Sequence, residues 1–275
     1  MIVGDVAQAE KDYRTALNTV RCYCNMHKYK FKLVEDSEYR QICGQRDFMF
    51  RRHCIVAELL KNTEWLMFLD ADVAVVNPNV LLEEYIDPAF DITFYDRFVN
   101  WEVAAGSYIV FLQRAFYPQL ADESQVCLRI WERSTNWNDL FTFEACIRTV
   151  MGDAHEFGKA RILKKGTAWL RDIWLTDSKW SPERDFMLHG LKDSNQISYA
   201  QGLFVNLIFT RFNWRSPFLS RLNLNDCTTR EYAENWEYNE DLKVPRKEIE
   251  KALNRRFAEV ERERWLSLVQ VSEYV

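Results

Sequence analysis

The sequence lacks several features that would place it in common classes of protein. Its 275 residues contain no run of 18 apolar residues, so no transmembrane helix is expected. The first residues have neither a charged segment nor a long apolar one, so they do not resemble a signal peptide. No Asn-x-Ser/Thr sequon occurs. The net charge of −5 and the absence of a basic stripe argue against a nucleic-acid-binding protein.

Cysteine pairing is also hard to detect in the sequence. Seven cysteines are scattered along the chain, and an odd number does not indicate a disulfide framework. Their spacing does not match a structural zinc site. One or two disulfides are compatible with the sequence if the protein resides in an oxidising compartment.

The composition is that of a globular protein with a large core. Hydrophobic residues make up 48% and aromatic residues 15% of the chain. Most of the aromatic side chains are expected in the core, and the alternative is that some line a sugar-binding cleft.

Hydrophobic periodicity predicts an alternation of helices and short strands. Helices are expected over 12–27, 48–61, 138–151, 198–210 and 245–271. Strands are expected at 31–34, 65–69, 73–76, 91–95 and 106–112, and within 167–174 and 186–188. The pattern favours an α/β fold with a mainly parallel central sheet, in which 1–225 form a catalytic domain and 226–275 a helical extension. Residues 2–4 are interpreted as the end of a truncated first strand.

Two carboxylates, Asp70 and Asp72, follow the apolar run of 65–69. Two buried anions so close together repel each other and lose hydration, and a divalent cation removes both penalties. Oxygen ligands suit Mg²⁺ or Mn²⁺, and the carboxyl end of a strand is where α/β sheets bind ligands. Asp-x-Asp also occurs by chance, and an Asp after a strand often caps a turn.

A second group follows 117 residues after Asp72, in His189-Gly190-Leu191-Lys192. A lone histidine is more often a structural polar residue, but here an imidazole stands beside a flexible glycine and a lysine suited to a phosphate. His189 would complete the metal shell, and Lys192 would neutralise a departing diphosphate.

The string from Trp65 to Pro78, which contains Asp70-Ala71-Asp72, resembles the metal motif of GT-A glycosyltransferases. The segment from His189 to Lys192 is similar to one in retaining GT-A enzymes. Longer strings, among them Tyr13–Val20, Asn100–Ser107 and Trp169–Trp174, resemble a nematode-rich family catalogued as domain of unknown function 273. That family is related to the galactosyl-, mannosyl- and xylosyltransferases of glycosyltransferase family 34.

The resemblance implies a GT-A (Rossmann-like) fold, a UDP- or GDP-sugar donor, a Mn²⁺ or Mg²⁺ ion and retention at the anomeric carbon. It implies that Asp70, Gly190 and Lys192 also bind the donor. Gly106 and Ser107 are expected to line the donor sugar, although Ala105 stands where a polar residue is usual. Glu144 is expected beside the reacting sugar, and its alternative is an exposed helix carboxylate. Ala145 replaces the usual Gln after it.

The leading hypothesis is a hexosyl- or pentosyltransferase that acts on a glycan or glycoprotein, in the Golgi lumen or secretory pathway as the resemblance implies. The first alternative is a catalytically inactive GT-A-like binding or scaffolding protein, which the departures at Ala105 and Ala145 favour. A metal-dependent phosphatase or nuclease is the second, but it lacks the further carboxylates of a two-metal site.

Overall fold

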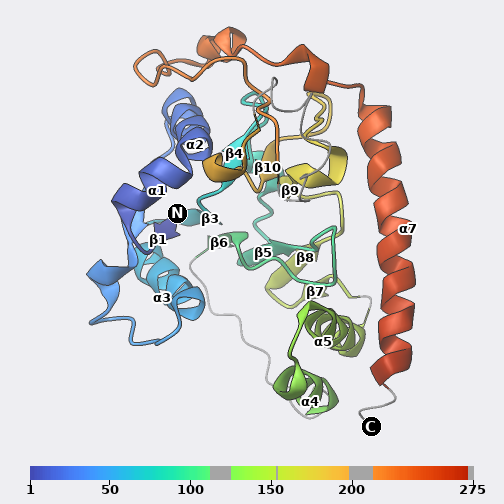
Figure 1. Ribbon diagram of the computed structural model, residues 1–275. Helices are drawn as coiled ribbons and strands as arrows, with labels where there is room; N and C mark the ends of the chain where they lie inside the picture. The colour runs from blue at the N-terminus through green and yellow to red at the C-terminus, as the bar shows by residue number, and fades with distance from the viewer. Residues whose placement is uncertain (112–124, 153, 198–212, 272–275) are drawn as a thin grey trace. The chain divides into compact units, whose positions relative to one another are not determined.

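The computed structural model describes residues 1–111, 125–152, 154–197 and 213–271 (Figure 1). Contacts between Cα atoms group Met1–Tyr85 with Trp169–Ala252 as a first unit, and Ile86–Ala168 with Leu253–Val275 as a second unit. Both units combine helices with β-strands, which confirms the α/β composition expected from the sequence.

The first unit contains helices and short strands from both ends of the chain. Its helices are α1 (Val6–Asp12), α2 (Arg14–His27), α3 (Phe48–Leu60) and the start of α7 (Arg246–Val271). Its strands are β1 (Ile2–Val3), β2 (Val34–Glu35), β3 (Trp65–Leu69), β4 (Val73–Val75), β9 (Leu170–Asp172) and β10 (Met187–His189). Short 3₁₀ helices connect them: η1 (Asp36–Tyr39), η2 (Leu82–Tyr85), η3 (Ile173–Thr176), η4 (Asp193–Asn195), η5 (Arg230–Asn235) and η6 (Glu240–Leu242).

Helix α2 packs against strand β4, as Figure 1 shows. Its buried residues Ala16, Leu17, Val20 and Cys24 recur at intervals of one, three and four, so one face of the helix is apolar. Thr19 on this face accepts a hydrogen bond at 3.0 Å from the backbone N–H of Val75 in β4. The contact fixes the helix over the strand that follows Asp72.

Strand β10 is the centre of a three-stranded sheet in the order β4-β10-β9. It runs antiparallel to β4 and parallel to β9. Arg171 in β9 holds the residues just before β10, because its guanidinium donates to both oxygens of Asp185 at 2.8 and 2.7 Å. Both side chains are almost fully buried, so removing Asp185 would leave the Arg171 guanidinium as a buried charge without its carboxylate partner.

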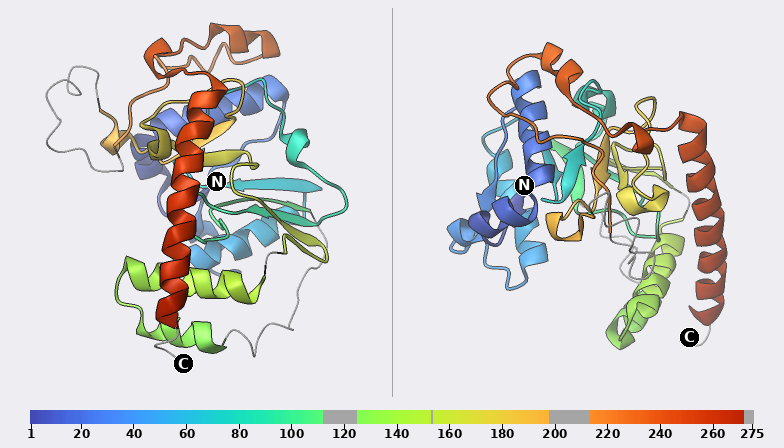
Figure 2. Two further views of the ribbon diagram at one scale, coloured as in Figure 1. Left: turned by 90° about the vertical axis from the view of Figure 1, so that its right-hand side faces the viewer. Right: turned by 45° about the horizontal axis from the view of Figure 1, so that its top comes forward.

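The second unit has a mixed sheet and a helical hairpin. Its strands, in the order β6-β5-β8-β7, are β5 (Ile92–Tyr95), β6 (Ser107–Phe111), β7 (Glu156–Phe157) and β8 (Ala160–Leu163). Strand β5 is antiparallel to β6 and parallel to β8, and β7 is antiparallel to β8. Helices α4 (Gln125–Arg133) and α5 (Trp137–Val150) lie side by side in Figures 1 and 2.

These pairings differ from the expected mainly parallel sheet, because the sheets described here mix both orientations. Predicted helices and strands agree with α2, α3, α5, α7, β3, β4 and β5 to within a few residues. Helices α1 and α4 and strands β7 and β8 were not predicted from the sequence. The helix expected over 198–210 lies outside the described residues. The domain boundary near residue 225 stays a prediction.

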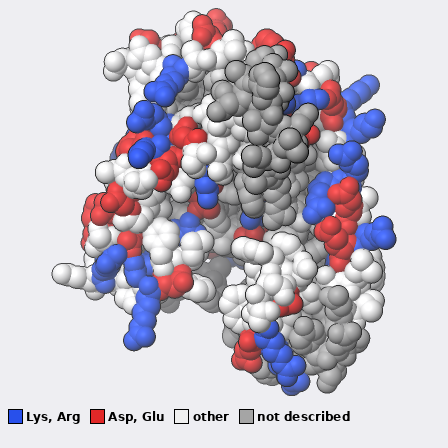
Figure 3. All heavy atoms as spheres, viewed as in Figure 1, with Lys and Arg blue, Asp and Glu red and all other residues white. Residues whose placement is uncertain are grey.

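Helix α7 confirms the amphipathic helix expected over 245–271. Ile249, Leu253 and Val260 are buried, whereas Phe257 and Leu266 of the predicted apolar set are exposed. Acidic and basic side chains alternate over its outer surface (Figure 3), and ion pairs such as Arg246 with Glu250 join successive turns. Among the helices of the described residues, none is both long and apolar enough to cross a membrane.

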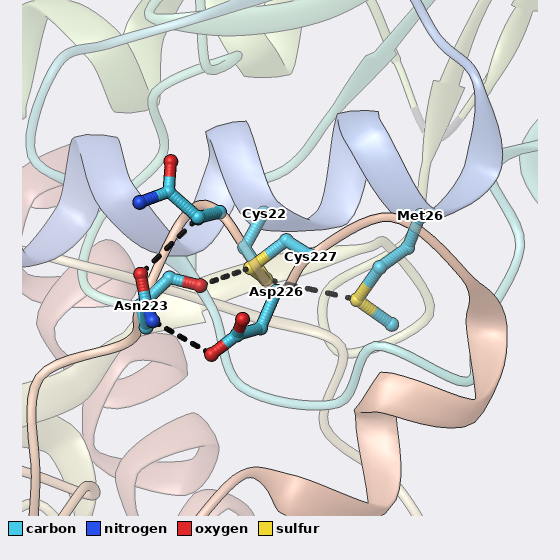
Figure 4. The surroundings of a disulfide bond; sticks show 6 residues. Cys22, Met26, Asn223, Asp226 and Cys227 are labelled. Carbon is cyan, nitrogen blue, oxygen red and sulfur yellow. Dashed lines mark hydrogen bonds between the residues drawn. A yellow bond between two sulfur atoms is a disulfide. The ribbon is translucent and has the colours of Figure 1, made fainter.

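Three disulfides correct the cysteine analysis, which left room for one or two. They join Cys43 to Cys54, Cys127 to Cys146, and Cys22 to Cys227. Cys24 is a free buried thiol on the same helix as Cys22. Figure 4 shows the Cys22–Cys227 bond between α2 and the segment around Asn223 and Asp226, with Sδ of Met26 at 3.7 Å from Sγ of Cys22.

The Cys22–Cys227 disulfide, which spans 205 residues, is expected to stabilise the first unit strongly. The double substitution Cys22→Ala/Cys227→Ala should lower the free energy of unfolding by about 2–5 kcal/mol, because the bond restricts the unfolded chain. Urea denaturation followed by circular dichroism measures this loss. Cys24→Ala is the control, since it removes a buried thiol and no disulfide. Equal destabilisation by the two variants would contradict the prediction.

Candidate metal site

Asp70 and Asp72 occupy the tight turn between strands β3 and β4. The turn is closed by the backbone N–H of Val73, which donates to the carbonyl of Asp70 at 3.3 Å. Asp70 is partly buried and Asp72 is buried. The turn therefore carries two carboxylates in a region of low solvent access, where they lose much of their hydration.

Strand pairing brings His189 to this turn. In the antiparallel pair of β4 and β10, His189 lies opposite Val73, the residue after Asp72. The backbone N–H groups of Gly190 and Leu191 then donate to the carbonyl of Asp72 at 3.1 and 3.0 Å. Gly190 has φ of 98°, a conformation that L side chains rarely adopt, so the glycine lets the chain turn here.

One ligand atom from each of Asp70, Asp72 and His189 can be chosen so that all lie within 4.8 Å of one another. Nε2 of His189 is 3.3 Å from Oδ1 of Asp72. Ligands on one octahedral ion with bonds of 2.0–2.1 Å are about 3–4 Å apart, so small side-chain rotations suffice to hold an ion. Two carboxylates and an imidazole suit Mn²⁺ or Mg²⁺ in their donor types.

Asp172 orients His189, and sequence reasoning did not single it out. The parallel pairing of β9 and β10 sets Asp172 opposite His189, and its Oδ1 lies 2.8 Å from Nδ1 of the imidazole. A proton on Nδ1 donated to this buried carboxylate leaves Nε2 directed to Asp72. The sequence signal for Asp172 was weak, because it stands 17 residues from His189 in a three-residue strand.

Arg52 is the second residue missed in the sequence. This arginine of α3 is almost fully buried and forms an ion pair with Oδ1 of Asp70. Its guanidinium carbon lies 5.5 Å from the ring centroid of Phe48 and 5.4 Å from that of Phe68. A charged residue on the buried face of a predicted helix was the available signal, since it requires a buried partner.

The cluster shifts the pKa of each of its ionisable members. Burial raises the pKa of Asp70, with Arg52 acting in the opposite direction. Burial also acts to raise the pKa of Asp72, but the charges of His189 and Lys192 hold it below its usual range. Burial disfavours the imidazolium of His189, yet Asp72 and Asp172 outweigh burial and raise its pKa to about 10. The cluster is therefore an ion-paired network, in which Asp72 and Asp172 both contact the imidazole of His189.

Lys192 is exposed beside this cluster, and its charge is felt at Asp72. Its backbone carbonyl accepts a hydrogen bond at 2.7 Å from the indole N–H of Trp214, which fixes the segment after Gly190. The structure thus brings Asp70, Asp72, His189 and Lys192 together in the first unit, with Gly190 forming the turn between them.

The remaining predicted site residues belong to the second unit. Gly106 precedes β6, and Ser107, its first residue, is buried. Glu144 lies on α5, and its Oε2 is buried with no hydrogen-bond partner among the described residues. Burial, followed by the negative charge of Glu102, raises the pKa of Glu144 to about 7. This differs from the alternative of an ordinary exposed carboxylate.

A family model described as "Protein of unknown function, DUF273" matches residues 20–111 and 110–205, and the chain belongs to this family. This confirms the family resemblance inferred from the sequence. No curated protein matches the chain significantly. A solved structure described as "crystal structure of a glycosyltransferase involved in the glycosylation of the major capsid of PBCV-1" is similar at 20% identity. The match covers 68% of this chain and 91% of that chain, with a TM-score of 0.37.

Asp172→Ala is expected to weaken Mn²⁺ binding by about 10- to 100-fold, because His189 loses the carboxylate that orients it. Asp172→Asn should have a smaller effect, since the amide oxygen still accepts the Nδ1 proton. Calorimetric titration with Mn²⁺ measures both. The control is Asp177→Asn, an exposed residue with φ of 50°, where Asn is tolerated. Equal affinity in wild type and Asp172→Ala would refute the orienting role.

Glu144→Gln is expected to stabilise the protein above neutral pH. The pKa of Glu144 is raised in the folded state from 4.5 to about 7, so its stabilising contribution is full below pH 4.5 and is lost as pH rises through 7. The neutral amide should add about 1–3 kcal/mol of stability at pH 8.5 and almost none at pH 4.5. Thermal unfolding at the two pH values measures the difference.

The matched control for this pH effect is Glu132→Gln on α4, an exposed glutamate of the same unit. It should shift the melting temperature equally at both pH values. If Glu144→Gln behaves like this control, burial does not raise the pKa of the Glu144 carboxyl in the folded state.

Proposed function

We propose that the chain is a metal-dependent glycosyltransferase of GT-A type that transfers a hexosyl or pentosyl unit from a UDP- or GDP-sugar to a glycan or glycoprotein, with retention. The observation that carries the proposal is the cluster of Asp70, Asp72 and His189, whose donor atoms lie within 4.8 Å of one another. We take 1–225 as its catalytic domain and 226–275 as a helical extension.

The cluster supports this function because it could provide the positive charge that stabilises a diphosphate leaving group. A divalent ion held there would neutralise the phosphate charge that develops as the glycosidic bond breaks. Lys192, exposed beside Asp72, supplies a second positive charge on a segment fixed by Trp214. Arg52 and Asp172 hold Asp70 and His189 in place, so the ligands are partly preorganised before an ion binds.

The roles of the second unit follow from the family resemblance. Gly106 and Ser107 would line the donor sugar, and Glu144 would lie beside the reacting carbon. The Glu144 carboxyl has a pKa of about 7, and its buried Oε2 has no hydrogen-bond partner among the described residues, so it has hydrogen-bonding capacity to offer a sugar hydroxyl. The three disulfides favour an oxidising compartment, which agrees with a proposed location in the Golgi lumen or secretory pathway.

The second candidate is a catalytically inactive GT-A-like protein that binds a nucleotide sugar or serves as a scaffold. Ala105 and Ala145 favour it, because they stand where related enzymes carry polar residues near the sugar. Such a protein would keep the metal cluster and its diphosphate contact while losing transfer.

Asp72→Asn is expected to reduce Mn²⁺-dependent binding of UDP or GDP by more than about 100-fold while the fold is kept. The substitution removes the carboxylate whose Oδ1 lies 3.3 Å from Nε2 of His189. Calorimetry with UDP- and GDP-sugars, with and without Mn²⁺, measures binding, and release of free nucleotide measures donor hydrolysis. Asp241→Asn, an exposed residue of η6, is the control.

The outcomes separate the candidates. Binding with hydrolysis in wild type and loss of both in Asp72→Asn supports the enzyme. Binding that depends on Asp72 without any hydrolysis or transfer supports the inactive relative. If neither nucleotide sugar binds in the presence of Mn²⁺, the glycosyltransferase proposal fails.

A further inference from the structure

A cavity of about 490 Å³ lies in the first unit and has a lining distinct from the metal cluster. Its wall is formed by the end of α1, the first turns of α2, residues around η4 and the segment 216–222. Three cationic side chains line it, those of Lys11, Arg14 and Arg221. One carboxylate, that of Asp193, faces them, so the formal charge of the lining is positive in a chain whose net charge is −5.

In the part of the chain that the structure describes, none of the three cations forms a close ion pair with a carboxylate, although the charge of Arg14 contributes to lowering the pKa of Glu10. Other arginines of the first unit are ion-paired, for example Arg52 with Asp70 and Arg171 with Asp185. Like charges gathered around one concave surface repel one another and raise the local potential, and an anion bound between them relieves that repulsion. The lining therefore favours an anionic ligand.

Asp193 offsets one of the three positive charges, and both of its carboxylate oxygens already accept hydrogen bonds from Thr15. Oδ1 accepts a hydrogen bond at 2.5 Å from the hydroxyl of Thr15, and Oδ2 accepts one at 3.1 Å from the backbone N–H of Thr15. These bonds satisfy the carboxylate at the start of α2 and fix η4 against that helix. The lining therefore keeps a positive formal charge, because three cations face one carboxylate.

The rest of the lining suits a sugar. Asn18, Gln196 and Ser216 present amide and hydroxyl groups, and Leu219, whose side chain is 70% exposed, adds an apolar surface. The volume falls in the range of about 300–1,000 Å³ that is usual for small-ligand sites. Asp193 follows Lys192 directly, so the cavity begins next to the segment assigned to the diphosphate.

We propose that this cavity binds an oxyanion group of the acceptor glycan, such as a sulfate, phosphate or carboxylate, with Lys11, Arg14 and Arg221 as its cationic contacts. The proposal rests on the proposed function, which supplies the acceptor. Arginine forms bidentate hydrogen bonds with planar or tetrahedral oxyanions, so two of the three contacts also give directional recognition. The diphosphate of the donor carries the same chemistry, and the experiment distinguishes the two sources.

The test compares a monosulfated disaccharide with its unsulfated form by calorimetry at low salt, and measures UDP binding with Mn²⁺ in parallel. Wild type should bind the sulfated form at least about tenfold more tightly than the unsulfated one. Arg14→Gln/Arg221→Gln should abolish this preference and keep UDP affinity. Asp72→Asn should weaken UDP binding with Mn²⁺ and keep the preference for the sulfated form. Arg40→Gln/Arg46→Gln, which removes two exposed arginines outside the cavity, is the matched control.

The following results would overturn the acceptor-site proposal or the proposed function. The proposal is overturned if wild type shows no preference for the sulfated form, or if the cavity variant matches the control. A loss of UDP affinity in Arg14→Gln/Arg221→Gln equal to that in Asp72→Asn assigns the cavity to the donor and overturns the acceptor role. If wild type shows the sulfate preference but binds no UDP with Mn²⁺, the proposed function fails and the oxyanion site stands.

Discussion

The antiparallel pairing of β4 with β10 is the constraint on which the candidate site depends. It sets His189 opposite Val73, and it lets the N–H groups of Gly190 and Leu191 bind the carbonyl of Asp72. A slip of one residue would turn His189 to the other face of the sheet, away from the carboxylates. Side chains that are 117 residues apart in the chain thus form one cluster because of backbone hydrogen bonds.

The buried carboxylates of the cluster lose hydration free energy, and contacts with the surrounding residues offset this loss. Asp70 and Asp72 are poorly hydrated, and each has a cationic neighbour in Arg52 or His189. Asp172 in turn holds His189. This chain of contacts orients Asp70, Asp72 and His189 relative to one another.

The sequence predicted the residues of the site whose side chains commonly bind metals. Asp70, Asp72 and His189 are typical metal ligands, and a buried strand before the first two made their position meaningful. Arg52 and Asp172 act through these ligands, and their partners become visible when the strands and α3 are placed in space. For Arg52 the sequence signal was a charge on the buried face of a predicted helix, and for Asp172 the signal was weak; neither identified the partner residue.

Long elements with one periodic apolar face, such as α2 and α7, were predicted well, whereas short strands were predicted in some cases, such as β4 and β5, and missed in others. Strands β7 and β8 have two and four residues, too few to show an alternation. Sheet direction was mistaken because an apolar run fits a buried strand of either orientation. The disulfides were underestimated because their partners lie 11, 19 and 205 residues apart, distances that no spacing rule links.

The first unit is built from two stretches of chain, and the Cys22–Cys227 bond joins them covalently. During synthesis, β5 to β8 all leave the ribosome before β9, β10 and Cys227 exist. The strands β5 to β8 of the second unit can therefore pair before β9, β10 and Cys227, which complete the first unit, have been synthesised. Asp70, Asp72 and His189 can accordingly come together only after the chain has been extended past His189, and the Cys22–Cys227 bond can form only after Cys227 has been added.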